Sequence, residues 1–314
     1  MITDCFDIQV NGYAGVDFNH DNLTTEDFEN ACREIKADGC TEFLPTIITD
    51  DISRMEARLR AIRSAIEQSS MIAEMVRGIH VEGPFLNAAD GTAGAHPRQH
   101  ICHADMDMMK RLLDASGHTI KLVTLAPECD SGHKVTRHLS NQGIVVSAGH
   151  CDPTIDELQA AIDQGLSMFT HVGNGCSLMQ NRHDNVVQRV LSLADQLWCC
   201  WIADGIHIPA FALKNYLKTA GCQRSIIVTD AMTAAGLEPG QYTLGSQPVI
   251  VDESYRAMLP DSDGRLAGSV ATAKWLQQVL ANDVGLSEAE IRTMMCDNPR
   301  KAIANELAQD FRCD

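Results

Sequence analysis

The sequence predicts a (β/α)8 barrel, the TIM-barrel fold of the α/β class. Eight short apolar runs alternate with amphipathic stretches along the 314 residues. This alternation is typical of a parallel sheet, and eight strand–helix units can close into a barrel of about 250 residues or more. Hydrophobic residues make up 45% of the chain and charged residues 21%, as in a packed globular protein.

The expected strands and helices follow one another in the order that this fold requires. The expected strands are 6–10, 41–48, 76–81, 120–125, 144–147, 167–170, 197–203 and 225–229. Apolar residues at helical spacing predict helices that include 25–38, 52–68, 104–115, 155–164, 186–194 and 209–220. Asp152, Pro153 and Thr154 are typical of a helix start, and Gly165 and Gly221 follow helices as stop signals.

We expect one barrel domain over residues 1–314, because the sequence has no internal repeat, low-complexity tract or obvious linker. The segment 231–269 holds several glycines and is expected to form a long loop over the barrel mouth, with room for a hairpin. Residues 270–314 are expected to form closing helices.

Charge and hydropathy exclude several classes of partner. The net charge of −17 would repel a phosphate backbone, so we expect no nucleic-acid partner. No apolar run reaches the roughly 18 residues that span a bilayer, and the opening MITDCFDIQV lacks the basic and apolar regions of a signal peptide. The 12 cysteines include no C-x-x-C pair and are expected to be reduced thiols. We therefore expect a cytoplasmic protein with a small-molecule partner, and an anionic substrate would need a local cationic pocket.

Ionisable side chains follow six of the expected strands. The C-terminal ends of barrel strands converge on one face, where the chemistry of this fold gathers. Any one such residue is best interpreted as a hydrogen-bonded polar group at a strand end, but six together predict an active site. The six are Glu82, Glu128, His150, His171, Asp204 (with His207 close behind) and Asp230.

Glu82, His150 and His171 are the candidate metal ligands. One carboxylate and two imidazoles from three strands suit zinc or iron(II), and they leave one position open for water. We therefore expect one divalent metal ion.

Three further residues have more than one interpretation. Asp230 ends the strand SIIVT and could accept a proton from a water at the metal; the alternative is a helix N-cap or a loop ion pair. His80 has the inward parity of Glu82, and we expect it to be a core histidine or a support for the ligands. Glu128 either joins the site or braces neighbouring loops.

A set of short motifs runs in a fixed order along most of the chain. They are DIQVNGYAGVDFN (7–19), GIHVEGPFLN (78–87), GAHP (94–97), LAPE (125–128), SAGHCDPT (147–154), THVGNG (170–175), ADGIHIP (203–209), TDAMTAAGL (229–237) and LAGS (266–269). With these motifs the chain resembles the N-acetylglucosamine-6-phosphate deacetylase family of the amidohydrolase superfamily. The succession of HVEGPF, GAHP, GH, TH and TDA is highly specific.

The resemblance implies catalytic roles for five matching residues. It implies that Glu82, His150 and His171 hold the metal, Zn²⁺ in first place and Fe²⁺ in second. It implies that Asp230 acts first as general base and then as general acid, and that His96 of GAHP polarises the scissile carbonyl.

The resemblance also implies a substrate site for an amino-sugar phosphate. His207 would contact the sugar, Asn174 and the backbone at Gly175 would hold the phosphate end, and Leu266 would line the acetyl pocket. Arg182 aligns with a family arginine that grips the phosphate and that can reach across from the neighbouring subunit of a homodimer. The alternative for Arg182 is a surface arginine paired with Asp184.

The sequence departs from the family pattern in three places. Many amidohydrolases bind a second metal with His-x-His after strand one, but this chain has Gln9 and Asn11 there, and neutral amides are poor ligands. The stretch VGNGCSLMQNRHDN replaces the usual family sequence after His171, which affects the expected phosphate contacts. The small β-sandwich usual in the family is expected to be absent, because the first expected strand starts within six residues of Met1.

The expected reaction is metal-dependent hydrolysis of the acetamide of an N-acetyl amino-sugar phosphate, with N-acetylglucosamine 6-phosphate as the first substrate. Two alternatives remain open. One is a deacetylase of another N-acyl amino sugar, such as the galacto epimer or an unphosphorylated sugar. The other is a sugar-phosphate-binding relative without catalysis, which the altered loop and the missing sandwich would allow.

Overall fold

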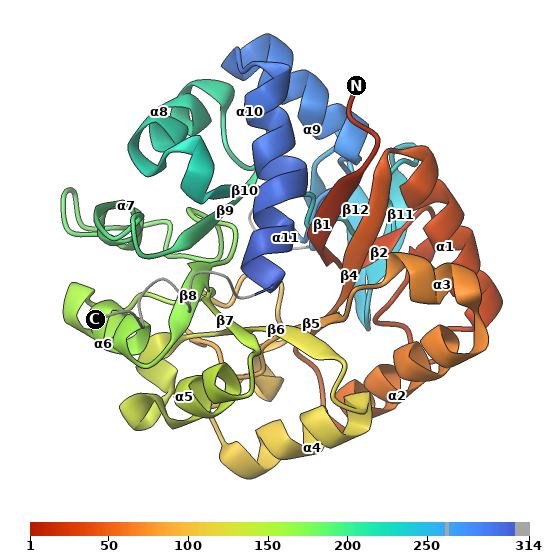
Figure 1. Ribbon diagram of the computed structural model, residues 1–314, viewed down its shortest axis with the longest axis horizontal. Helices are drawn as coiled ribbons and strands as arrows, with labels where there is room; N and C mark the ends of the chain where they lie inside the picture. The colour runs from red at the N-terminus through yellow and green to blue at the C-terminus, as the bar shows by residue number, and fades with distance from the viewer. Residues whose placement is uncertain (261–263, 305–314) are drawn as a thin grey trace.

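A computed structural model describes residues 1–260 and 264–304, and it contains the predicted barrel (Figure 1). Eight parallel strands form one sheet in chain order, with helices outside them. The strands are β1 (Cys5–Val10), β4 (Cys40–Ile48), β5 (Ile79–Glu82), β6 (Ile120–Leu125), β7 (Val145–Ala148), β8 (Leu166–Phe169), β9 (Trp198–Ile202) and β10 (Ser225–Val228). All eight predicted strands are therefore confirmed, with bounds that shift by at most a few residues.

The barrel closes where β1 meets β10. The backbone N–H of Asn11 donates to Ala231 O at 2.7 Å, and Val10 forms a parallel bridge with Ala231. Below this bridge the backbone N–H and the hydroxyl of Thr229 both donate to the buried carboxylate of Asp7. This seam brings the ends of the first and last strands together.

Helices surround the barrel and pack their apolar faces on the sheet. They are α1 (Thr25–Ala37), α2 (Ile52–Gln68), α3 (Ser70–Met75), α4 (Met106–Ser116), α5 (Lys134–Asn141), α6 (Ile155–Asp163), α7 (Val186–Ser192) and α8 (Ala210–Ala220). The predicted start of α6 is confirmed by a capping box, in which Thr154 and Glu157 bond each other's backbone N–H groups. The short helices α3 and α5 were not predicted. Helix α5 follows two 3-10 turns, η2 (Pro127–Cys129) and η3 (Ser131–His133).

Apolar residues fill the interior of the barrel because alternate strand residues point inward. Phe6 and Ile8 of β1 meet Trp198, Cys200 and Ile202 of β9 in one buried cluster. Helix α11 (Asn298–Ile303) adds Ala302 to this cluster and crosses the end of the barrel where the strands begin (Figure 1). The polar residues lie at the opposite end of the barrel, where the strands end.

The predicted loop 231–269 contains a small antiparallel sheet. Its strands are β11 (Gly240–Leu244), β12 (Gln247–Val251) and β13 (Ala257–Met258), so the expected hairpin is present and has a third strand beside it. A second hairpin, β2 (Gly12–Tyr13) and β3 (Val16–Asp17), follows β1. Two further 3-10 turns are η1 (Arg98–His100) and η4 (Cys222–Arg224).

The predicted closing helices are present from α9 (Ala273–Val279) onward. After α9 come the π-helical turn η5 (Leu280–Val284), α10 (Glu288–Arg292), the π-helical turn η6 (Thr293–Asp297) and α11. Residues 305–314 of that prediction lie outside the described part of the chain. Within the described part, the cysteines are free thiols, and no helix combines the length and apolar character that crossing a bilayer requires.

Candidate metal centre and active site

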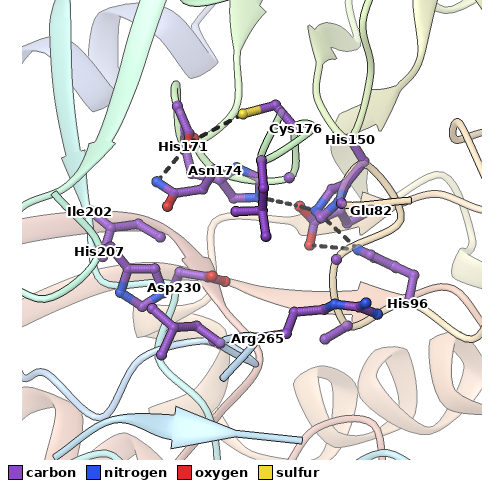
Figure 2. A pocket seen from close by; sticks show the side chains of 18 of the residues that line it. Glu82, His96, His150, His171, Asn174, Cys176, Ile202, His207, Asp230 and Arg265 are labelled. Atoms are coloured by element: carbon purple, nitrogen blue, oxygen red, sulfur yellow. Dashed lines mark hydrogen bonds and ion pairs between the residues drawn. The ribbon is translucent and has the colours of Figure 1, made fainter. Parts of the chain in front are cut away.

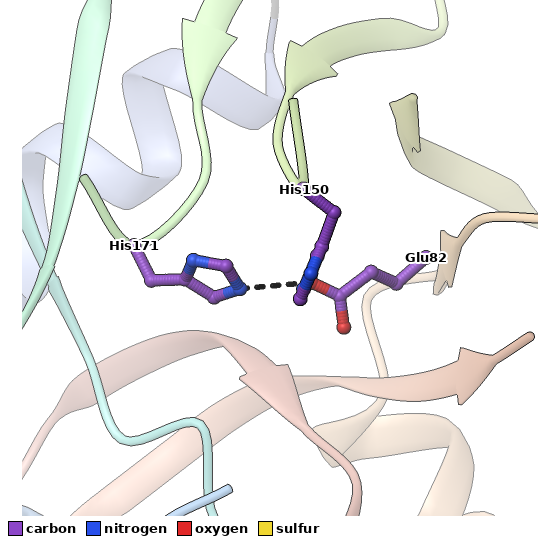
Figure 3. Close-up of side chains that lie close together, drawn as sticks. All are labelled: Glu82, His150 and His171. Atoms are coloured by element: carbon purple, nitrogen blue, oxygen red, sulfur yellow. Dashed lines mark hydrogen bonds and ion pairs between the residues drawn. The ribbon is translucent and has the colours of Figure 1, made fainter. Parts of the chain in front are cut away.

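The side chains of Glu82, His150 and His171 meet at the C-terminal end of the barrel (Figure 3). Glu82 is the last residue of β5, and the two histidines follow β7 and β8. Glu82 Oε1 lies 3.1 Å from His171 Nε2 and 3.4 Å from His150 Nε2, and all three side chains are buried. The structure therefore brings the three predicted ligands together.

The cluster fits a divalent ion by the spacing and chemistry of its donors. Ligands about 2.1 Å from a tetrahedral ion are separated from each other by about 3.4 Å, which is close to the two spacings at Glu82 Oε1. His150 Nδ1 lies 2.8 Å from the carbonyl oxygen of Thr92. Because a carbonyl can only accept, the Nδ1 of His150 carries the hydrogen and the lone pair of Nε2 faces Glu82. A histidine that binds a metal through Nε2 needs this tautomer, because its Nε2 lone pair is available.

Electrostatics favour the ionised form of the carboxylate in this cluster. Burial alone would raise the pKa of Glu82, but the rings of His150 and His171, when they are protonated and donate to it, outweigh burial and hold the pKa well below its usual value. Burial would lower the pKa of His171, yet Glu82 raises it overall. The carboxylate of Glu82 is therefore negatively charged and would attract a metal cation.

Asp230 lies beside this cluster at the end of β10. Its Oδ1 accepts a hydrogen bond of 2.7 Å from the side-chain amide of Asn11. Burial, followed by the charge of Glu82, raises the pKa of Asp230 to about 6. No ion pair or helix cap within the described residues uses Asp230, which argues against the two alternative interpretations of this residue.

His96 of the GAHP motif reaches the same cluster from the loop after β5. Its Nε2 lies 3.2 Å from His150 Nε2 and 3.8 Å from Glu82 Oε2, and its Nδ1 lies 2.9 Å from the hydroxyl of Thr49. Burial, followed by the neighbouring His150, lowers the pKa of His96 to about 3, so the imidazole is neutral at pH 7. A neutral imidazole can donate one hydrogen bond into the site.

Three of these residues adopt a left-handed backbone conformation directly after their strands. The φ angles are 50° at His150, 31° at His171 and 50° at Asp230. Residues other than glycine rarely adopt such angles, and they do so mostly where surrounding structure holds a functional group in place. The turn aims each side chain across the end of the barrel.

A cavity of about 670 Å³ opens above the cluster (Figure 2). Of the predicted substrate residues, His207, Asn174, Gly175 and Leu266 line it. The ring of His207 is oriented by Asp204, whose Oδ2 lies 2.6 Å from His207 Nδ1. The residue types and the cavity size suit a small polar ligand.

Arg182 does not line this cavity. It lies on an exposed part of the loop after β8, and Asp184, its alternative partner, pairs with Arg189 at 2.6 Å. The surface pair between Arg182 and Asp184 is therefore not formed. A phosphate contact from Arg182 stays a prediction, and it would require a neighbouring subunit.

The structure also settles how His80 and Glu128 are used. His80 Nε2 lies 2.8 Å from the Thr124 hydroxyl, inside the barrel, as expected for a core histidine. Glu128 accepts hydrogen bonds from Asn87 Nδ2 at 2.9 Å and from the backbone N–H of Asp152 at 2.7 Å. Glu128 therefore braces two loops and does not line the cavity.

Four further residues of the site were not predicted as members of it. Gln9 and Asn11 donate to Glu82 and Asp230, and Thr49 contacts His96. Arg265 lines the cavity, and its position directly before the LAGS motif is the signal that could have identified it (Figure 2). Gln9 and Asn11 stand where many amidohydrolases have His-x-His, whereas no pattern in the sequence points to Thr49.

Comparisons with known proteins show which proteins this chain is similar to. The chain is 32% identical over 305 residues to N-acetylglucosamine-6-phosphate deacetylase of Bacillus subtilis, which covers 96% of this chain and 75% of that protein. It is 28% identical over 297 residues to N-acetylgalactosamine-6-phosphate deacetylase of Escherichia coli, which covers 95% of this chain and 76% of that protein.

The fold is shared with solved structures of the same kind. An N-acetyl-D-glucosamine-6-phosphate deacetylase mutant from Mycobacterium smegmatis, in complex with N-acetyl-D-glucosamine-6-phosphate, has a TM-score of 0.87 at 26% identity and covers 96% of this chain and 77% of that one. No family model matches the sequence. On the similarity to the Bacillus subtilis protein, which extends over nearly the whole sequence, this chain belongs to the N-acetylglucosamine-6-phosphate deacetylase family.

Proposed function

We propose that this chain hydrolyses the acetamide of N-acetylglucosamine 6-phosphate to acetate and glucosamine 6-phosphate, with one divalent metal at Glu82, His150 and His171. The observation that carries the proposal is the convergence of these three donors with Asp230 and His96 in one cavity. The family to which the chain belongs supplies the reaction. Zinc is the first candidate metal and iron(II) the second, since both suit two imidazoles and a carboxylate.

Asp230 is the proposed proton carrier of the reaction. Its carboxylate accepts a proton from the water that attacks the acetamide carbon, and it returns that proton to the nitrogen as the C–N bond breaks. An amine leaves poorly unless it is protonated, so the return of the proton is as necessary as its removal. A pKa raised to about 6 makes Asp230 a better base than an ordinary carboxylate while it stays mainly ionised at pH 7.

His96 is the proposed donor to the carbonyl oxygen. If the hydroxyl of Thr49 donates to Nδ1, the hydrogen of the neutral ring is on Nε2, which faces the cluster. Such a fixed donor stabilises the negative charge that develops on oxygen during attack, often by a few kcal/mol. A divalent ion in the cluster would add Lewis acidity, which polarises the carbonyl and makes water a better nucleophile.

A second candidate substrate is N-acetylgalactosamine 6-phosphate. The similarity to the N-acetylgalactosamine-6-phosphate deacetylase of Escherichia coli extends over 95% of this chain, at 28% identity. This similarity supports the galacto epimer as a candidate substrate. A sugar-phosphate-binding protein without catalysis is less well supported, because the three donors, Asp230 and His96 are all in place.

Acetate release is the direct test. Protein of measured metal content would be incubated with both N-acetylhexosamine 6-phosphates and with unphosphorylated N-acetylglucosamine. We expect release from at least the gluco 6-phosphate, loss of release after chelation, and recovery with Zn²⁺ or Fe²⁺. Metal-loaded protein that releases no acetate from any of the three would contradict the proposal.

A further inference from the structure

The wall of the cavity contains few groups that could hold a phosphate. Glu82, Asp90 and Asp230 line it, and among residues 1–260 and 264–304 Arg265 is the one arginine or lysine that does so. A phosphate monoester carries a charge of about −1.5 to −2 at neutral pH, and proteins bind it preferentially with guanidinium or ammonium groups. In a chain of net charge −17, an anionic substrate needs a local cation.

We propose that Arg265 binds the phosphate of the amino-sugar substrate and thereby selects phosphorylated sugars. The inference rests on the proposed deacetylase function and names the group that recognises the charged end of its substrate. It gives this role to a residue of the same subunit, whereas Arg182 lies outside the cavity.

The burial of the lining side chains separates a deep end of the cavity from a rim. The side chain of Glu82 is 3% exposed, whereas that of Arg265 is 35% exposed and that of its ion-pair partner Asp90 is 85% exposed. Figure 2 shows the Arg265 side chain extended across the cavity. The acetamide on carbon 2 and the phosphate on carbon 6 lie far apart on the sugar, so an acetamide at the deep end leaves the phosphate near the rim.

A second loop lies next to the loop that carries Asp90. The loop that carries Asp90 packs on the loop after β8, since a Cβ at Gly91 would lie 2.9 Å from the carbonyl oxygen of Cys176. Asn174 and Gly175, the residues expected at the phosphate end, belong to that second loop. Arg265 Nη2 lies 3.7 Å from Asp90 Oδ1, and this exposed carboxylate also pairs with Arg98.

The test compares Arg265→Ala and Arg265→Lys with Arg256→Ala, which removes the same charge from the same loop at a residue outside the cavity. Binding of glucosamine 6-phosphate and of glucosamine is measured by calorimetry, alongside kcat and KM for N-acetylglucosamine 6-phosphate. We expect Arg265→Ala to raise the Kd and the KM of the phosphorylated compounds by about tenfold or more, with kcat changed little. Arg265→Lys should lose less, and Arg256→Ala should match the wild type.

Asp90→Asn should have the opposite effect on phosphate binding to Arg265→Ala. Removal of this carboxylate from the rim should lower the Kd of glucosamine 6-phosphate, because it removes a negative charge that repels the phosphate. An unchanged Kd in Arg265→Ala, an equal loss for glucosamine and its phosphate, or a wild type that binds neither would overturn the assignment. Weakened binding in Arg265→Ala without acetate release from the wild type would instead preserve the assignment and refute the deacetylase function.

Discussion

The side-chain amide of Asn11 donates to Asp230 Oδ1 at 2.7 Å and so joins the end of β1 to the end of β10. Two residues earlier on β1, Gln9 Nε2 donates to Glu82 Oε1 at 3.1 Å. One strand therefore gives an amide to each of the two carboxylates of the site. At the positions where a two-metal relative would have two histidines, this chain orients the groups that one metal needs.

Asp230→Asn should nearly abolish turnover and leave the metal in place. The substitution keeps the size of the side chain but removes the base, and general acid–base catalysis contributes about 10²- to 10⁴-fold. Asp230 does not belong to the three-donor cluster, so metal content should stay at the wild-type level. Acetate release and metal analysis on the same preparation check both points, and wild-type turnover would show that another group carries the proton.

Asn11→Ala and Gln9→Ala should have different effects, although both remove one amide from β1. Asn11→Ala leaves Asp230 without its amide donor, so kcat should fall by about tenfold while the metal stays bound. Gln9→Ala removes a support of Glu82 and should weaken metal affinity by about 10- to 100-fold, the range found for groups that orient metal ligands. Competition with a chelator measures the affinity, and identical behaviour of the two variants would contradict this division of roles.

The order of the chain was enough to predict the barrel and the main cluster. Parallel strands in a closed barrel all end on the same face, so Glu82, His150 and His171 had to converge once their strands were recognised. The family resemblance added His96, which follows no strand directly and reaches the cluster through a loop. Neither the strand order nor the family resemblance depended on the detailed path of any loop.

The residues that were missed depend on packing between segments far apart in sequence. Arg265 lines the cavity because residues 264–266 lie at its wall, and Arg182 is outside it because the loop after β8 leads that residue to the surface. Loop paths of this kind are set by contacts that no local pattern encodes. The roles of Gln9 and Asn11 became visible only through their hydrogen bonds.

Gly175→Ala should disturb the metal centre through His150. A Cβ at Gly175 would lie 2.7 Å from His150 Nδ1, the atom that is fixed on the carbonyl oxygen of Thr92. Gly143→Ala is the matched control, because Gly143 also has a positive φ but nothing lies within 4 Å of its added Cβ. Both variants should lose about 1 kcal/mol of stability from backbone strain, but Gly175→Ala alone should lose metal affinity. Equal metal affinity in the two variants would mean that the ring of His150 can move without cost.

Asp7→Asn should change how the stability of the protein depends on pH. Asp7 is buried at the seam of the barrel, where it accepts hydrogen bonds from Thr229 and from the backbone N–H of Gln9. Burial raises the pKa of Asp7 from 3.8 to about 7, so the folded state holds a proton that the unfolded state releases. The free energy of unfolding should therefore fall as the pH rises from about 4 to about 7, by up to a few kcal/mol from this group.

Asparagine keeps an acceptor for the backbone N–H groups of Thr229 and Gln9 but has no charge to bury. The difference in unfolding free energy between Asp7→Asn and the wild type should therefore move in favour of the variant between pH 5 and pH 8. Urea unfolding at the two pH values, with equal metal content, measures this difference, and Asp195→Asn, at an exposed position, controls for loss of one surface charge. A difference that stays constant across the two pH values would mean that Asp7 holds the same charge in the folded and unfolded states, and that its contacts with Thr229 offset the whole cost of burial.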